Sequence, residues 1–135
     1  MKDVKNLKYH FDHVEIDVRN LRLSVGSEVR PLEPKSFRLL LFLVENPGRA
    51  LTKEEIMTVV WPDTAVSDNS LARAITQIRK ALDDDPKAPR YIETVPSVGY
   101  RFVAELKVEI NENLGAEAAS EKALGAEPPI VSLLG

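Results

Sequence analysis

The sequence predicts an α+β fold in which a small antiparallel sheet is followed by three helices and a final β-hairpin. Three observations support this prediction. The first third of the chain alternates apolar and polar residues with a period of two, which is typical of strands that bury one face. The middle third repeats its apolar residues every three or four positions, as helices do. Alternation with a period of two returns after residue 90.

Composition limits the chain to one ordinary domain with a core. The 135 residues are 44% hydrophobic and 29% charged, as in globular proteins. The absence of cysteine excludes a disulfide scaffold and thiolate metal sites. The charged N-terminus is unlike a signal peptide, and no stretch approaches the roughly 20 apolar residues that span a bilayer. We therefore expect a cytoplasmic location.

Charge is distributed unevenly along the chain. The net charge is −3, but residues 105–135 alone carry six glutamates and two lysines, which leaves the remaining residues at +1. A surface that binds anions must therefore be local.

Four short strands are predicted first, and their turns suggest a four-stranded antiparallel meander. Gly26-Ser27 forms the last of these turns. The predicted strands cover residues 8–11, 14–18, 21–25 and 28–32.

Two helices with clear ends come next. The first begins at Pro34, because proline suits the first helical turn, and it stops at residues 46–48, Asn-Pro-Gly. The second starts with a capping box formed by Thr52 and Glu55 and stops before Pro62.

A third helix, the hairpin and a tail complete the predicted order. The helix covers residues 67–82, is capped by Ser67 or Asp68, and is closed by three aspartates and a proline. The hairpin pairs residues 91–95 with 99–106. We expect residues 1–106 to form the domain and residues 107–135 to form an acidic flexible linker or tail.

The third helix has two chemically distinct faces. Leu71, Ile75, Ile78 and Leu82 lie within about 60° of one another on a helical wheel and predict a buried seam. The opposite face carries polar residues suited to the edges of DNA bases in a major groove, and residues 69–82 contain no acid. Most helices of this pattern are simply solvated, so periodicity alone leaves both interpretations open. The polar residues are Asn69, Arg73, Thr76, Gln77 and Lys80.

The elements around the third helix favour the interpretation that its polar face binds DNA. A short helix, a longer helix with this polar face and a following β-hairpin form the element order of a winged helix-turn-helix. In that fold the longer helix enters the major groove and the hairpin, called the wing, lies along the backbone. The alternative is a winged helix that contacts proteins and has little affinity for DNA.

Several spaced motifs resemble the OmpR/PhoB-type winged-helix DNA-binding domain of bacterial transcriptional regulators. They include NPGR (46–49), VW (60–61), IRKAL (78–82) and GYRF (99–102), and the similarity extends over residues 8–106. The resemblance implies binding to double-stranded promoter DNA at repeated half-sites. It also allows self-association on DNA and contact with RNA polymerase, and it implies no cofactor, metal or small-molecule substrate.

The resemblance also assigns roles to individual residues. Arg73, Thr76 and Gln77 would contact base edges, and Lys80 would lie near base edges or phosphate. The residues expected along the DNA backbone are Trp61, Asn69, Ser70, Arg79, Thr94 and Arg101. Trp61 could instead be a packing residue, and Arg101 could instead support the hairpin.

Three features of this chain differ from the usual pattern of the OmpR/PhoB-type family. Pro96 and Ser97 stand where the family often has a basic residue and a glycine, so we expect a wing with less charge. Glu33 replaces the usual Thr or Ser cap of the first helix. We expect no receiver domain before residue 8, which is similar to the ToxR/CadC arrangement, in which a linker leads from the DNA-binding domain to a membrane or sensory segment.

Catalytic and metal-binding patterns are not found. The sequence has no cysteine nucleophile, HExxH motif or glycine-rich phosphate loop, so we do not expect an enzyme. His10 and His13 lack a matching third ligand. The aspartates at 83–85 lack the spacing of a calcium loop, and we interpret them as a solvated turn.

Overall fold

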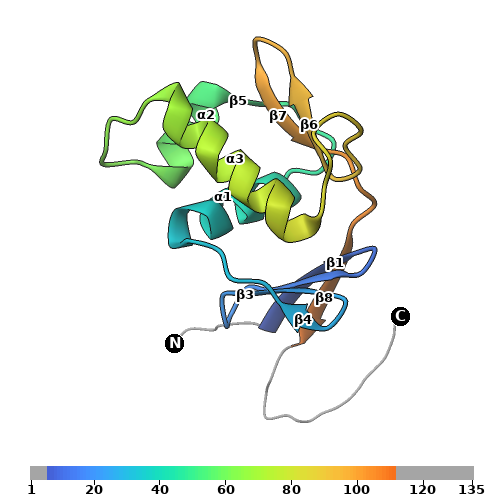
Figure 1. Cartoon of the computed structure of the whole chain (residues 1–135). Helices are drawn as coiled ribbons and strands as arrows, with labels where there is room; N and C mark the ends of the chain where they lie inside the picture. Colours follow the sequence, from blue (N-terminus) through green and yellow to red (C-terminus); the bar gives the residue numbers. More distant parts are fainter. Residues whose placement is uncertain (1–5, 112–135) are drawn as a thin grey trace.

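The computed structural model describes residues 6–111, in which three helices lie between two antiparallel sheets. The larger sheet forms one end of the molecule and the wing hairpin the other, with the helices between them (Figure 1). The predicted α+β winged-helix architecture is confirmed.

The larger sheet has five strands rather than the predicted four. Its order is β4-β3-β2-β1-β8, and all neighbouring pairs are antiparallel. The additional strand β8 falls in the segment predicted to be a tail, so the sheet includes residues beyond 106. Its register partners on β1 are about one hundred positions away in sequence, and no local pattern reveals such pairing. The strands are β1 (Asn6–Phe11), β2 (Val14–Asp17), β3 (Arg22–Val25), β4 (Glu28–Val29) and β8 (Lys107–Asn111).

The three helices begin close to their predicted starts. Helix α1 spans Pro34–Val44, and its N-cap residue Glu33 makes no side-chain capping hydrogen bond. Helix α2 spans Lys53–Val60 and helix α3 spans Asp68–Leu82, with Ser67 as the N-cap residue of α3. The end of α2 is held by Lys35, whose Nζ donates to the carbonyl oxygen of Val60 at 3.0 Å.

The predicted capping box at the start of α2 is confirmed. The Thr52 hydroxyl accepts from the backbone N–H of Glu55 at 3.0 Å, and the Glu55 carboxylate accepts from the Thr52 N–H at 2.9 Å. This backbone hydrogen bond, together with Arg49, holds the pKa of Glu55 below its usual value. The box fixes the entry of the chain into α2.

A second sheet of three strands contains the wing, and its order is β5-β7-β6. The hairpin strands are β6 (Ile92–Val95) and β7 (Gly99–Phe102), so the second strand ends four residues before its predicted end at 106. The short strand β5 (Leu51–Thr52), which the sequence did not predict, pairs with β7 directly before α2 begins. The wing is therefore joined to the start of α2 as well as to the end of α3.

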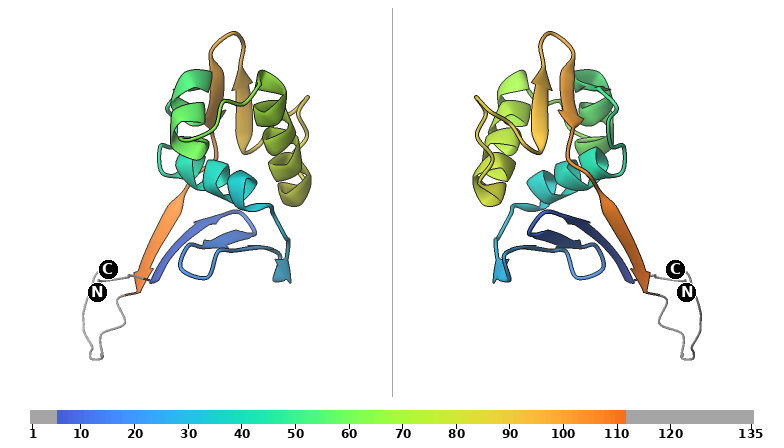
Figure 2. Two further views of the ribbon diagram at one scale, coloured as in Figure 1. Left: turned by 90° about the vertical axis from the view of Figure 1, so that its left-hand side faces the viewer. Right: turned by 90° about the vertical axis from the view of Figure 1, so that its right-hand side faces the viewer.

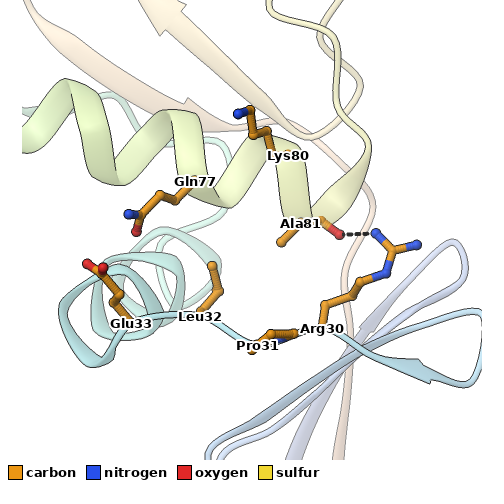
Figure 3. A pocket seen from close by; sticks show the side chains of 7 residues that line it. All are labelled: Arg30, Pro31, Leu32, Glu33, Gln77, Lys80 and Ala81. Atoms are coloured by element: carbon orange, nitrogen blue, oxygen red, sulfur yellow. Dashed lines mark hydrogen bonds between the residues drawn. The ribbon is translucent and has the colours of Figure 1, made fainter.

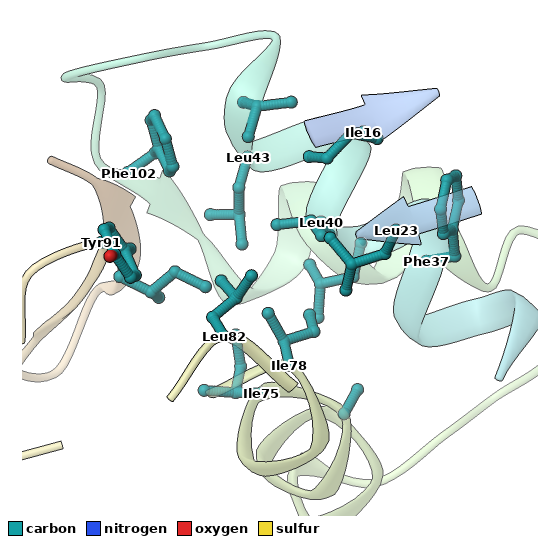
Figure 4. Close-up of a cluster of buried hydrophobic side chains, with 14 of the residues drawn as sticks. Ile16, Leu23, Phe37, Leu40, Leu43, Ile75, Ile78, Leu82, Tyr91 and Phe102 are labelled. Carbon is teal, nitrogen blue, oxygen red and sulfur yellow. The ribbon is translucent and has the colours of Figure 1, made fainter. Parts of the chain in front are cut away.

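One hydrophobic core connects the helices, the larger sheet and the wing (Figure 4). Ile75, Ile78 and Leu82 of α3 face α1 and the sheet, as the predicted seam requires. Phe11 of β1 makes edge-to-face contacts with Tyr91 and Phe102, with ring centroids 5.1 and 4.9 Å apart. This aromatic cluster joins the larger sheet to the wing.

Among residues 6–111, no helix combines the length and apolar character needed to cross a bilayer. Residues 112–135, which the sequence assigns to a linker or tail, lie outside the described part of the chain.

Candidate nucleic-acid interface

Helix α3 exposes the polar face that the sequence predicted. Asn69, Arg73, Thr76 and Lys80 are all exposed, whereas the opposite seam is buried. The helix lies along one side of the molecule, and the wing projects beyond it at the end away from the larger sheet (Figure 2). An elongated polyanion can therefore approach α3 without meeting the sheet.

The charge on this face is not neutralised by neighbouring residues. Arg73 and Lys80 make no ion pair with any residue between positions 6 and 111. The acid at the N-terminal end of the helix, Asp68, lies 3.7 Å from Lys53 Nζ of α2. The two free cations, about two turns apart, give a local positive surface on a nearly neutral domain.

Gln77 is separated from the other predicted base-reading residues. It is half-buried, and its Oε1 accepts a hydrogen bond of 2.6 Å from Ser36 Oγ, a buried hydroxyl of α1. The side chain points toward the segment before α1, away from Lys80 (Figure 3). Paired recognition of adenine needs both the oxygen and the nitrogen of a glutamine. Because its side chain points away from the exposed face, Gln77 has to turn toward that face before it can make this contact (Figure 3).

Gln77 also borders an open hollow of about 560 Å³ between α3 and residues 30–33. Arg30 closes one side of it, because its guanidinium donates to the carbonyl oxygen of Ala81 at 2.8 Å and pairs with Asp83 at 3.3 Å (Figure 3). The positive charge of Arg30 is thus used at the C-terminal end of α3, where it stabilises the helix dipole.

Arg79 and Thr94, both predicted to contact the DNA backbone, contact each other. The Arg79 guanidinium donates to the Thr94 hydroxyl at 3.0 Å and to the Ile92 carbonyl oxygen at 2.9 Å. Its Nε is buried and has no hydrogen-bond partner among the described residues. Arg79 thus ties α3 to strand β6.

A second tie between α3 and the wing comes from Asp84, which sequence reasoning missed. This carboxylate is buried and accepts the backbone N–H groups of Arg90, Tyr91 and Ile92 at 2.7, 3.3 and 3.0 Å. The interpretation of residues 83–85 as a solvated turn is therefore wrong for Asp84. The sequence gives little indication of this role, because nothing in it distinguishes Asp84 from the adjacent Asp83 and Asp85.

The wing tip is short and carries no basic residue. Pro96 and Ser97 form its turn, and Ser97 adopts a φ of 66°, the left-handed conformation that glycine usually takes. Arg101 of β7 is half-buried, and its Nε lies 3.3 Å from the Glu93 carboxylate without the geometry of a hydrogen bond. This contact supports the hairpin and reduces the charge that Arg101 can offer to DNA.

The two remaining predicted residues flank the loop between α2 and α3. Trp61 is half-buried against the core and is the C-cap residue of α2, so the structure gives it a packing role. Ser70 is half-buried in the first turn of α3. No described residue hydrogen-bonds the Trp61 indole N–H, which remains able to donate to a phosphate.

Metal-ligating groups do not gather within residues 6–111: no three His, Cys, Asp or Glu side chains lie close enough to hold an ion. His10 instead pairs with Glu109 of β8, its Nε2 lying 2.8 Å from a carboxylate oxygen. His10 therefore has a structural partner.

Comparison with known proteins agrees with this geometry. The family described as "Transcriptional regulatory protein, C terminal" matches residues 26–102. The cholera toxin homolog transcriptional activator of Vibrio parahaemolyticus is 34% identical over 106 residues, covering 77% of this chain and 35% of that protein. The transcriptional activator CadC of Escherichia coli is 33% identical over 100 residues, 73% of this chain and 19% of CadC. The chain thus spans about a third or less of these relatives.

Solved structures show the same fold. The DNA-binding domain of Escherichia coli CadC has a TM-score of 0.66 at 26% identity and covers 77% of this chain and 98% of that one. The Klebsiella pneumoniae RstA DNA-binding domain, in complex with RstA box, has a TM-score of 0.64 at 26% identity and covers 71% of this chain and 96% of that one. With the family match over residues 26–102, these similarities show that the chain belongs to the OmpR/PhoB-type family of transcriptional regulatory proteins.

Proposed function

We propose that this domain binds double-stranded DNA in a sequence-specific manner and regulates transcription. Helix α3 enters the major groove, and the wing lies against the adjacent backbone. The observation that carries the proposal is the exposed face of α3, where Arg73 and Lys80 are free of acidic partners in the described part of the chain. The solved RstA domain, whose fold this chain shares, is in complex with RstA box.

The contacts divide into base readout and positioning. Arg73, Thr76 and Lys80 are exposed on one face and reach base edges. The Thr76 hydroxyl donates to the Ala72 carbonyl oxygen at 2.9 Å, so its methyl group is the part that suits a thymine methyl. Gln77 joins this set after its side chain turns toward the exposed face.

The backbone contacts are fewer than the sequence predicted. Asn69, Ser70 and the Trp61 indole N–H lie at the N-terminal end of α3 and in the preceding loop, where they meet phosphates. Arg79 and Thr94 act mainly by fixing the wing to α3. Arg101 approaches the backbone with its charge partly balanced by Glu93.

The proposal extends to the whole protein. It acts in the cytoplasm at promoters with repeated half-sites, associates with itself on DNA and contacts RNA polymerase. It has no small-molecule substrate and no enzymatic activity.

Salt dependence tests the central claim. Binding of residues 1–135 to DNA selected from a random pool should weaken steeply as salt rises, because every neutralised phosphate contributes about −0.9 to the slope of log K against log salt. Fluorescence anisotropy between low and physiological ionic strength measures that slope. Absent binding, or binding with a flat slope, contradicts the proposal.

Replacing Arg73 with alanine should weaken binding to the selected site by about 1–3 kcal/mol and relax the preference at one base position. Arg22→Ala is the matched control, since Arg22 is also exposed and lies on β3, in the sheet away from α3. Selection from random DNA with both variants measures affinity and preference together. If Arg73→Ala keeps the wild-type preference at every position, the assignment of α3 as the reading helix is wrong.

A second candidate function is a protein-binding winged helix. The uncharged wing tip at Pro96 and Ser97 and the pairing of Arg101 with Glu93 favour it, because they reduce the charge available to a DNA backbone. This candidate predicts no selected DNA sequence and no effect of Arg73→Ala on DNA.

A further inference from the structure

Strand β8 forms one edge of the five-stranded sheet. Its neighbour on one side is β1, and no described strand lies on its other side. In an antiparallel ladder only alternate residues point their backbone groups outward. The Leu7 carbonyl oxygen accepts from Val18 on the β2 side, so Leu7 does not bond its register partner Ile110. Val108 and Ile110 therefore offer backbone N–H and C=O groups to a further strand. The opposite edge, β4, has only two residues. In Figure 2, β8 lies on the far side of the molecule from α3, so this edge remains open when α3 is occupied.

Two large apolar side chains of β8 are unusually exposed. Val108 and Ile110 are 52% and 56% exposed, and their register partners on β1 are Tyr9 and Leu7. Directly paired residues share a face of the sheet, and Tyr9 belongs to the buried core while Leu7 packs against it. The core-facing side of the sheet therefore continues onto β8, where no described element covers it.

The charges on the other face of β8 specify a partner strand. Lys107 and Glu109 flank Val108 on opposite sides. If a second β8 pairs antiparallel with Val108 opposite Val108, each Lys107 stands opposite Glu109 of the second copy. A shift that places Lys107 opposite Lys107, or Glu109 opposite Glu109, sets like charges against each other and is disfavoured. The strand is thus complementary to itself in one register.

We propose that two copies of this chain associate by antiparallel pairing of their β8 strands about a twofold axis at Val108. The contact is isologous and joins two five-stranded sheets into one of ten strands. It brings together the exposed Val108 and Ile110 side chains of both copies. Because only residues 107–109 of the two β8 strands pair with each other in this register, the interface is small, and its population rises with protein concentration. This association requires no DNA and does not rest on the proposed function.

Disulfide trapping tests the register, because the chain has no cysteine of its own. Opposite residues of antiparallel strands have Cα atoms about 4.5–5.5 Å apart, within the range that a disulfide spans. Val108→Cys should form a covalent dimer with oxidised glutathione several-fold faster than Val29→Cys. Val29 is the matched control, since it is 57% exposed on the other edge of the same sheet. Equal rates for the two variants overturn the proposal.

Charge reversal provides an independent test. Lys107→Glu and Glu109→Lys should each associate less than wild type, because like charges then face each other across the axis. Glu109→Lys also loses the contact with His10 within its own copy, so the comparison with the mixture decides the test. An equimolar mixture of the two variants restores both opposite-charge pairs, so it should associate more than either variant alone. Sedimentation velocity measures association, and circular dichroism confirms that both variants are folded. A mixture that behaves as the average of its components contradicts the proposed pairing, whether or not the protein binds DNA.

Discussion

Replacing Asp84 with alanine is expected to lower the free energy of unfolding by about 3 kcal/mol. The buried carboxylate accepts three backbone N–H groups of residues 90–92. Alanine leaves those groups without acceptors in a site that water reaches poorly, and each unsatisfied buried donor costs on the order of 1–3 kcal/mol. Urea denaturation followed by circular dichroism measures the change.

Asp85→Ala is the matched control for this loss. Asp85 is exposed, and its carboxylate accepts a single hydrogen bond among the described residues, from the Lys87 N–H at 2.9 Å, so its replacement should cost about 1 kcal/mol or less. Asp84→Asn should fall between the two, because an amide keeps one acceptor oxygen. If Asp84→Ala and Asp85→Ala are equally stable, Asp84 does not hold the loop between α3 and β6.

Replacing Gly99 with alanine should be similarly damaging, with an expected loss of about 3 kcal/mol or more. A Cβ atom at this position would lie 1.9 Å from the Leu51 carbonyl oxygen and 3.1 Å from the Cα of Thr52. These are backbone atoms of β5, so no side-chain rotation relieves the overlap. Strand β5 has to move away from β7, which also shifts the start of α2. Thermal and urea unfolding of the variant measure the loss.

Gly26→Ala separates steric overlap from backbone strain. Gly26 has a φ of 57° and no atom within 4 Å of the added Cβ, so alanine there should cost only about 1 kcal/mol of strain. The expected order of stability is wild type, then Gly26→Ala, then Gly99→Ala. If Gly99→Ala is instead the more stable of the two variants, β5 can move away from β7 at little cost, and the close approach of the two strands does not restrict position 99.

Features set by neighbouring residues could be predicted from the sequence. The capping box of Thr52 and Glu55 and the buried seam of α3 depend on spacings of three or four residues, which the sequence displays directly. Strands β5 and β8 could not be predicted in this way. Strand β5 has only two residues, and β8 pairs with a strand at the other end of the described chain. Their alternation is too short to reveal a distant partner.

In the candidate interface, too, features set by neighbouring residues could be predicted and those set by distant residues could not. The exposure of Arg73, Thr76 and Lys80 follows from helical periodicity and is confirmed. The bond from Ser36 to Gln77 joins residues 41 positions apart, and the bonds of Arg79 join it to residues 13 and 15 positions away. The helical wheel cannot distinguish a side chain held by another element from one that is free. The roles of all these side chains in binding DNA stay predictions.

The pairing of β1 with β8 also determines how the domain can be connected to other chains. Asn6 and Asn111 are register partners, so the described chain enters and leaves the domain at one point. A domain with adjacent ends can be inserted into a loop of another protein with little distortion of either partner. Its mechanical response follows as well. A pull between those ends opens the β1–β8 ladder one residue pair at a time, as a zipper opens, so the domain should yield at low force.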